Sequence, residues 1–201
     1  MHLTFKKEFD GDMEKLPKRE VPGSHQFKEF GDLKKLSLVA NALAIGIFIV
    51  LMIPAGKVFL SHFDRFEIGL WKLLILLVAE ILVIPVHEFL HATMFKGDVQ
   101  FYTYLKKGLA FVVGDESMTK GRFVLMSLLP NIVLGLVPYI LFFFFPQEIL
   151  LAMFAAGNLA AGAGDYINVY HALTQMPKGS LTYMSGIHSY WYMPGETGES
   201  E

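Results

Sequence analysis

The sequence contains no cysteine and little charge. Without cysteine, the chain has no disulfides, thiolate metal ligands, thiol nucleophiles or iron–sulfur ligands. Asp, Glu, Lys and Arg make up 18% of its 201 residues, against about 25% in soluble domains. The formal net charge of −2 provides no basic field for phosphate groups, which excludes a nucleic-acid-binding protein.

Long apolar runs are present instead. Hydrophobic residues make up 53% of the chain and are gathered into four stretches. A bilayer core about 30 Å thick is crossed by about 20 helical residues, and each stretch reaches or approaches that length. We therefore predict an all-α membrane protein with four transmembrane helices. The predicted spans are residues 36–53, 68–95, 123–145 and 149–173.

The segments between these spans differ in their content of Lys and Arg. Eight of the 17 precede residue 36, five lie in the loop between the second and third spans, and one lies in the tail. Because cytoplasmic loops are enriched in these residues, both termini are predicted to face the cytoplasm, in a multi-pass protein of the plasma membrane. The predicted parts are a cytoplasmic arm with little local structure (1–35), a membrane domain (36–176) and a cytoplasmic tail (177–201).

Strand-like sequence occurs in the loop between the second and third spans. Two stretches rich in Tyr, Phe, Val and Thr are separated by Lys-Lys-Gly, which predicts a cytoplasmic β-hairpin over 99–113. Two roles stay open for it: a structural cap over the neighbouring helix, or an edge that binds an unwound substrate as an added strand. The candidate substrate-binding residues are Val99, Phe101, Leu109 and Phe111. Further strand-like stretches are 181–184 and 189–193.

The motif that carries chemistry lies at the end of the second predicted span, where residues 85–91 read Pro-Val-His-Glu-Phe-Leu-His. Residues four apart share a helix face, so His87 and His91 can present two imidazole nitrogens to one metal ion. Glu88 can accept a proton from a metal-bound water and pass it to a leaving amine. Since charge within a span is costly and normally functional, we predict one Zn²⁺ per chain with Glu88 as the general base.

A third protein ligand would leave one zinc position open for water. Asp165 is the acid inside the fourth predicted span, and small residues around it let that helix approach a neighbour closely. We predict Asp165 as the third ligand. Two alternatives are that Asp165 only forms an interhelical hydrogen bond, or that His171 is the ligand. Asn158 and Asn168 lie near the Asp165 face, either as hydrogen-bond partners of the site or as packing residues.

Glu80 lies seven residues before His87 and therefore on nearly the same helix face. It is a candidate for a polar partner of the site or for part of a water path. Burial as a protonated, hydrogen-bonded acid is an equally open interpretation.

Four segments of the chain together resemble a known family. They are residues 87–91, Leu129-Pro130-Asn131, Gly164-Asp165 and Pro177-Lys178-Gly179. They resemble the bacterial putative zincin peptidases, membrane proteins that are distantly similar to site-2 intramembrane metalloproteases. This resemblance implies a zinc metalloprotease that acts on membrane-protein or peptide substrates at the lipid bilayer. It also implies that His87, His91 and Asp165 bind zinc and that Glu88 is the base.

Two other functions remain open at this point. One is a catalytically idle zinc-fold scaffold that binds a partner membrane protein, although zinc binding alone does not require an intact Glu88. The other is a cation transporter in which Glu80, His87, Glu88 and Asp165 line the path. The sequence shows no inverted repeat, which argues against transport.

Overall fold

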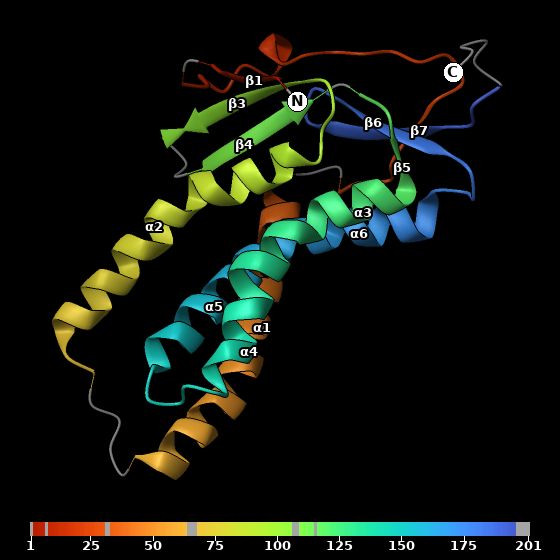
Figure 1. Ribbon diagram of the computed structural model, residues 1–201. Coiled ribbons are helices and arrows are strands. Elements are labelled where there is room, and N and C mark those ends of the chain that lie inside the picture. The colour runs from red at the N-terminus through yellow and green to blue at the C-terminus, as the bar shows by residue number, and fades with distance from the viewer. Residues whose placement is uncertain are drawn as a thin grey trace. The chain divides into compact units, whose positions relative to one another are not determined.

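The computed structural model describes residues 2–6, 8–30, 33–63, 68–105, 109–114 and 116–195, and over these ranges the protein is mixed α/β (Figure 1). The prediction of an all-α protein is therefore wrong, because two β-sheets form from the segments outside the apolar helices. The strands that were not predicted are short and pair with segments far away in the sequence. Alternation of apolar and polar residues over only a few positions is weak evidence for a strand unless the partner strand is known.

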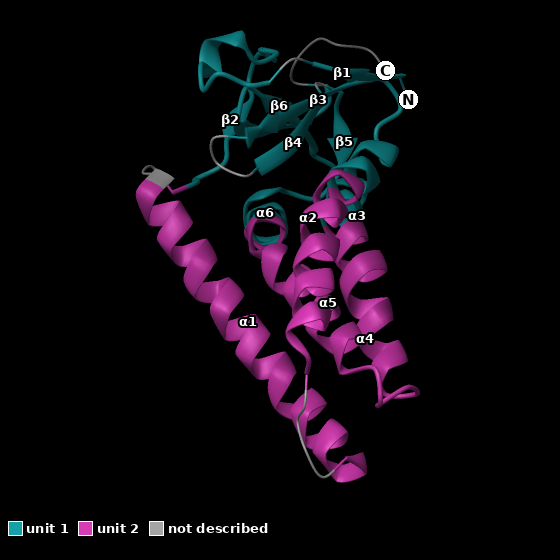
Figure 2. Ribbon diagram, turned by 90° about the vertical axis from the view of Figure 1, so that its left-hand side faces the viewer, with its two compact units in different colours: residues 1–29, 88–127, 168–201 teal, residues 30–87, 128–167 magenta. Residues whose placement is uncertain are grey.

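The chain forms two compact units (Figure 2). Unit 1 comprises Met1–Glu29, Glu88–Ser127 and Asn168–Glu201. Unit 2 comprises Phe30–His87 and Leu128–Ile167. Unit 1 thus joins three segments that are distant in sequence, whereas unit 2 holds most of the apolar helical residues.

Apolar helices make up unit 2. Helix α1 (Leu33–His62) packs against α5 (Ile149–Ala161), and α5 also packs against α4 (Val137–Phe142). Alanines on the facing helices let their backbones approach closely, which is the usual basis of helix packing in membranes. The buried core of this unit consists of Ala55, Phe59, Tyr139, Phe142, Ile149, Ala152 and Ala155.

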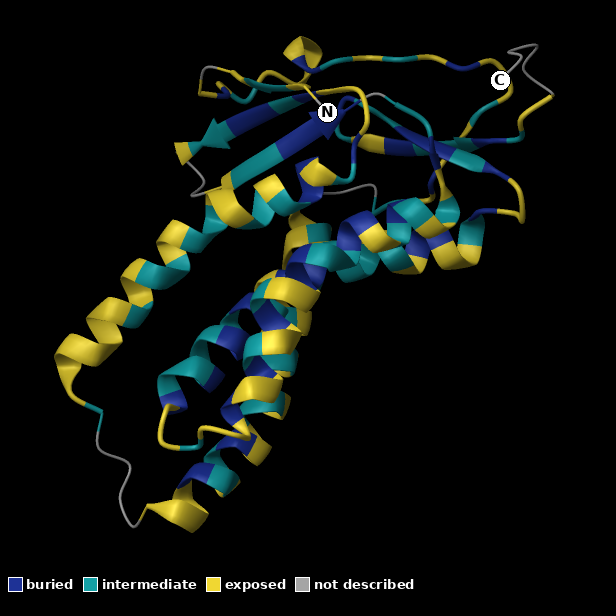
Figure 3. Ribbon diagram, viewed as in Figure 1, coloured by how far each residue is buried: buried dark blue, intermediate teal, exposed yellow. Residues whose placement is uncertain are grey.

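Among the described residues, three helices are long and apolar enough to cross a membrane, which indicates a membrane protein. The first is Lys34–His62 within α1, and the second is α2 (Leu70–Thr93). The third, Lys120–Phe142, combines α3 (Lys120–Pro130), the π-helical turn η3 (Asn131–Leu136) and α4. In the most apolar 18-residue stretches of α1 and α2, no described residue is buried, and Figure 3 shows exposed positions along both helices. Their apolar side chains are therefore available to lipid.

The fourth predicted span is not one continuous helix. Helix α5 ends at Ala161, α6 (Ala163–Gln175) begins two residues later, and the two are bent by 46°. A Cβ atom at Gly162, between them, would lie 1.7 Å from Oδ1 of Asn131, so glycine lets the chain bend around a buried amide. The prediction of four transmembrane helices is therefore wrong. The described residues contain three candidate spans and a broken helix pair that passes the same test only when its halves are counted together.

Two sheets form in unit 1. In the first, β3 (Asp98–Tyr104) pairs with the antiparallel β4 (Leu109–Gly114) and, on its other side, with the parallel β1 (His2–Phe5). The antiparallel pairing of β3 and β4 confirms the predicted hairpin. The second sheet has the order β2-β7-β6-β5. Its strands are β2 (His25–Gln26), β7 (His188–Tyr192), β6 (Leu181–Ser185) and β5 (Met118–Thr119).

The strands of the tail were predicted, and those of the N-terminal arm were not. β6 and β7 confirm the two strand-like stretches after residue 180. The arm contributes β1 to the first sheet and β2 to the second, together with the short helix η1 (Met13–Lys15), although little local structure was expected there. Four-residue and two-residue strands are stabilised by their partners rather than by local propensity.

The core of unit 1 holds the end of α2 in place. Ala92 and Phe95 are 0% and 4% exposed and pack among residues from β3, β4, α3 and α6. This cluster consists of Phe27, Ala92, Phe95, Val99, Phe101, Val112, Met118, Phe123, Met126, Ala172 and Met176. The end of α2, directly after the His-Glu motif, is therefore anchored by burial of Ala92 and of Phe95.

Candidate metal centre

The His-Glu motif forms a compact group of potential ligands on α2. One ligand atom from each of His87, Glu88 and His91 lies within 4.8 Å of the others. His87 and Glu88 are half-buried and His91 is buried. The grouping follows from helix geometry, since residues three apart (Glu88 and His91) and four apart (His87 and His91) are neighbours on a helix surface.

His91 is held in the orientation that a metal ligand requires. Its Nδ1 lies 2.8 Å from the carbonyl oxygen of Met126, on α3. Because a carbonyl only accepts hydrogen bonds, Nδ1 carries the proton and Nε2 of the neutral ring keeps its lone pair. A second hydrogen bond of this kind is typical of metal-binding histidines, because it fixes both the tautomer and the ring plane.

Asp165 lies beside His87. Its Oδ2 is 3.3 Å from Nε2 of His87, and the two side chains are 15% and 16% exposed. Zinc bonds of about 2.0–2.2 Å in a tetrahedral arrangement place two donor atoms roughly 3.3–3.6 Å apart. Two imidazoles and a carboxylate also form a donor set that zinc accepts in catalytic sites. The donor types of His87, His91 and Asp165 therefore fit a zinc ion, and His87 and Asp165 are spaced as two of its ligands would be.

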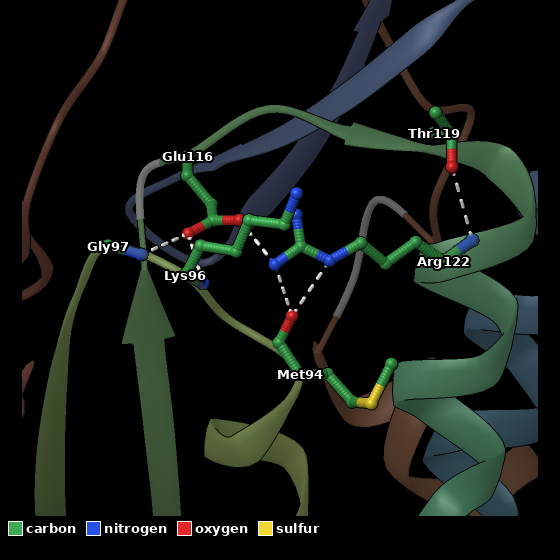
Figure 4. Close-up of polar contacts among 6 residues, drawn as sticks. All are labelled: Met94, Lys96, Gly97, Glu116, Thr119 and Arg122. Atoms are coloured by element: carbon green, nitrogen blue, oxygen red, sulfur yellow. Dashed lines mark hydrogen bonds and ion pairs between the residues drawn. The ribbon is translucent and has the colours of Figure 1, made fainter. Parts of the chain in front are cut away.

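A polar cluster holds the chain directly after α2 (Figure 4). Arg122 donates to the carbonyl of Met94 from Nε at 2.8 Å and from Nη2, and Nη2 also pairs with Oε1 of Glu116 at 2.6 Å. Oε2 of Glu116 accepts hydrogen bonds from the backbone N–H groups of Lys96 and Gly97 at 2.6 and 2.5 Å. Carbonyls at a helix end have no partner within the helix, so the cation supplies both donors and a favourable charge there.

We expect Arg122→Met to destabilise unit 1 by about 1.5–3 kcal/mol, because it removes charged hydrogen bonds and leaves Glu116 without its cation. Thermal unfolding in detergent measures the change. Lys18→Met is the control, because Lys18 forms an exposed ion pair with Glu14, and such pairs contribute little. Equal melting temperatures for the two variants would show that the cluster does not stabilise the end of α2.

Glu80 and Asn158 lie together in unit 2. Nδ2 of Asn158 donates to Oε2 of Glu80 at 3.2 Å and to the carbonyl of Phe154 at 2.9 Å. Gly157 makes room for this contact, since a Cβ atom there would lie 2.4 Å from Oε1 of Glu80. The structure therefore gives Asn158, predicted as a partner of the Asp165 face, a contact with Glu80.

Asn168 and His171 both lie on the part of α6 that belongs to unit 1. Asn168 is exposed. His171 is 6% exposed, and its ring packs edge-on against Phe27 with the centroids 6.3 Å apart. Packing against the core of unit 1 accounts for the burial of His171, which was the alternative third ligand.

The candidate substrate-binding residues occupy different positions in the first sheet. Val99 and Phe101 are buried on β3, and both edges of that strand are paired, with β1 and with β4. Leu109 and Phe111 lie on β4, which is an outer strand in the sheet order. Among these four residues, those on β4 lie on a strand whose other edge has no partner strand within the described part of the chain.

The groups that support the ligands were not identified from sequence. They are the Met126 carbonyl, the amide of Asn131 and the cluster of Arg122 and Glu116. Every residue has a backbone carbonyl, so the sequence does not show which one accepts a hydrogen bond. Arg122 and Glu116, which form the ion pair, are residue types that are common on protein surfaces. Only Pro130-Asn131 gave a signal, as part of a segment that resembles the zincin peptidases.

Comparison with known proteins confirms the family. Residues 80–181 match the family described as putative zincin peptidase, and the match covers half of the chain, including His87, Glu88, His91 and Asp165. No curated protein and no solved structure matches the chain. Membership implies a peptidase domain and zinc, for which the motif on α2 provides the donors. The chain belongs to the putative zincin peptidase family.

Proposed function

We propose that this protein is a zinc-dependent membrane peptidase that cleaves membrane or membrane-proximal proteins near the cytoplasmic face. The observation that carries the proposal is the group formed by His87, Glu88 and His91 at the end of a candidate span. Asp165, 3.3 Å from His87, is the proposed third ligand of one zinc ion per chain. This assignment is the one implied by the resemblance to the zincin peptidases, which are distantly similar to the site-2 proteases.

The proposed chemistry is general acid–base catalysis by Glu88. When bound, zinc acts as a Lewis acid toward water and a peptide carbonyl. Glu88 takes a proton from the attacking water and passes it to the nitrogen of the leaving amine. The carboxylate is half-buried beside the two histidines, within reach of the same small volume. An intact Glu88 favours an enzyme over an idle zinc scaffold, because metal binding alone needs no carboxylate at this position.

A substrate segment from the membrane has to be unwound first, since the carbonyls of an intact helix are hydrogen-bonded within it. The edge of β4 that has no partner strand among the described residues offers backbone groups to which an unwound chain can add as a strand. We therefore assign Leu109 and Phe111 to this edge, and we do not assign substrate binding to the buried residues of β3.

The pairing of the strands supports a topology in which both terminal regions lie on the same side of the membrane. β1 near the N-terminus pairs with β3 in the middle loop, and β2 pairs with β7 in the tail. Hydrogen-bonded strands cannot be separated by a bilayer, so we infer that these three regions share one side. After the third candidate span, the broken pair of α5 and α6 returns the chain to that side, as a bent pair rather than as a fourth continuous helix. The three regions hold most of the Lys and Arg, which assigns that side to the cytoplasm and the protein to the plasma membrane.

This topology predicts a labelling pattern that the cysteine-free chain makes simple to read. We expect single variants Lys28→Cys and Lys178→Cys to react with an impermeant maleimide only after cells are opened. Ser61→Cys, at the end of α1, should react in intact cells. Labelling of Lys178→Cys in intact cells would contradict a cytoplasmic tail.

The proposed function predicts that the purified protein holds about one zinc per chain and loses peptide hydrolysis when the metal is removed. Elemental analysis gives the metal content, and a library of fluorogenic peptides gives the activity before chelation, after it and after zinc is returned. Recovery with zinc is the expected result. Hydrolysis that persists in metal-free protein would refute a zinc peptidase.

A further inference from the structure

We propose that Pro130 and Asn131 are positioning residues that orient two of the metal ligands through two separate contacts. Pro130 acts on His91 and Asn131 acts on Asp165. The inference rests on the proposed function in one respect, namely that these two ligands bind zinc. It assigns a role to the point where the third candidate span changes from α-helix to π-helical turn.

The first contact depends on what proline lacks. In an α-helix, the N–H of residue 130 would donate to the carbonyl of Met126, four residues earlier. Proline has no N–H, and its ring pushes that carbonyl outward. The Met126 oxygen accepts a hydrogen bond from Nδ1 of His91 instead, at 2.8 Å. Pro130 thereby frees the acceptor that fixes the tautomer and ring plane of His91.

The second contact is made by the amide of Asn131, which is 3% exposed. Its Nδ2 donates to Oδ2 of Asp165 at 2.8 Å, the same oxygen that lies 3.3 Å from His87. The hydroxyl of Tyr166 lies 3.0 Å from Oδ1 of Asn131 and 2.9 Å from the carbonyl oxygen of Leu159, and these two acceptors share its one proton. The amide is thus held from both ends, with its donor toward the carboxylate.

The backbone of unit 2 is shaped around this amide. The N–H of Val137 bonds to the carbonyl of Ile132, five residues back, so the turn after Pro130 is wider than an α-helical turn. Such π-helical turns occur often at functional sites. Across from it, Gly162 has no Cβ, and one would lie 1.7 Å from Oδ1 of Asn131.

Packing alone does not account for these features. A buried amide has to be hydrogen-bonded to offset the loss of water, whereas an apolar side chain of similar size carries no such cost. The chain nevertheless keeps Asn131, the glycine that makes room for it and the hydroxyl that orients it. The group served by this arrangement is the carboxylate of Asp165.

The test uses Co²⁺ as the probe, since its visible absorption reports both affinity and coordination. We expect Asn131→Leu to weaken Co²⁺ binding by about 10–100-fold and to change the spectrum, as loss of a ligand's hydrogen-bond partner typically does. Pro130→Ala should weaken binding less, because the restored N–H competes for the Met126 carbonyl rather than removing it. In metal-free protein, ¹⁵N NMR should show less Nδ1-protonated His91 in Pro130→Ala.

Two matched variants control for loss of a buried asparagine and of a proline within a span. Asn158→Leu removes an asparagine that is also 3% exposed and lies in the same unit, but contacts Glu80. Pro138→Ala removes a proline from α4 in the same span. We expect both to bind Co²⁺ as the wild type does. Equal weakening in the controls, or wild-type binding by Asn131→Leu and Pro130→Ala, would overturn the inference.

A second pair of variants separates positioning from stability. Gly162→Ala displaces the amide and should lower both the melting temperature and Co²⁺ affinity. Adding Asn131→Ala relieves the clash, so the melting temperature should recover while the affinity stays low. Joint recovery of both would show a purely structural role and overturn the inference. Co²⁺ binding by His87→Ala that equals binding by the wild type would instead overturn the proposed function. The two failures are therefore distinct.

Discussion

Replacing Glu88 by glutamine is expected to slow peptide hydrolysis by about 10²–10⁴-fold while the protein keeps about one zinc per chain. Glutamine preserves the size of the side chain and a carbonyl acceptor, but it cannot take a proton from water. Insertion into the membrane should be unaffected, because the change removes a potential charge from the end of a candidate span. Zinc content and turnover measured on the same preparation check this expectation.

The matched control for this variant is Glu148→Gln, the same chemical change at an exposed residue before α5. It should leave both zinc content and turnover unchanged. Near-normal cleavage by Glu88→Gln would contradict general base catalysis by this carboxylate. Loss of zinc from Glu88→Gln would make Glu88 a ligand, a role that its place in the ligand group permits.

His87→Ala is expected to abolish zinc retention through gel filtration, because it removes the proposed ligand that lies next to both of the others. His87 shares a helical turn with His91, and its Nε2 lies 3.3 Å from Asp165. Asp165→Asn should weaken zinc binding less, since the amide oxygen is still a ligand, although a poorer one. Elemental analysis of the purified variants measures the difference.

The control for the histidine change is His62→Ala. His62 is exposed at the end of α1, where its Nδ1 lies 2.9 Å from the carbonyl of Val58. It should retain zinc as the wild type does. Full zinc occupancy in His87→Ala would exclude the motif as the metal site.

The parts of the site that follow from local geometry were predictable from the sequence. His87, Glu88 and His91 lie within one turn, so their spacing alone brings the ligand atoms together. The hairpin was predictable for the same reason, because its two strands are adjacent in sequence. Asp165 was chosen as the acid within an apolar stretch, and the structure places it beside His87.

Features that depend on distant partners were not predictable. An apolar run of about 20 residues indicates a span by length, but the break at Gly162 depends on the side chain of Asn131 from another helix. β1 and β2 are too short to be detected without β3 and β7, with which they pair. The acceptor that orients His91 is a backbone carbonyl, which no residue pattern reveals.

Cells that produce the wild-type protein are expected to release fragments of membrane proteins that cells with only Glu88→Gln do not release. Quantitative proteomics of peptides shed from matched membranes measures this difference directly, whichever membrane protein is the substrate. The predicted result is a set of cleavage sites within or next to spans that depends on Glu88 and disappears when zinc is chelated. Identical fragments from the two kinds of membrane, with equal amounts of both proteins present, would contradict a zinc-dependent membrane peptidase.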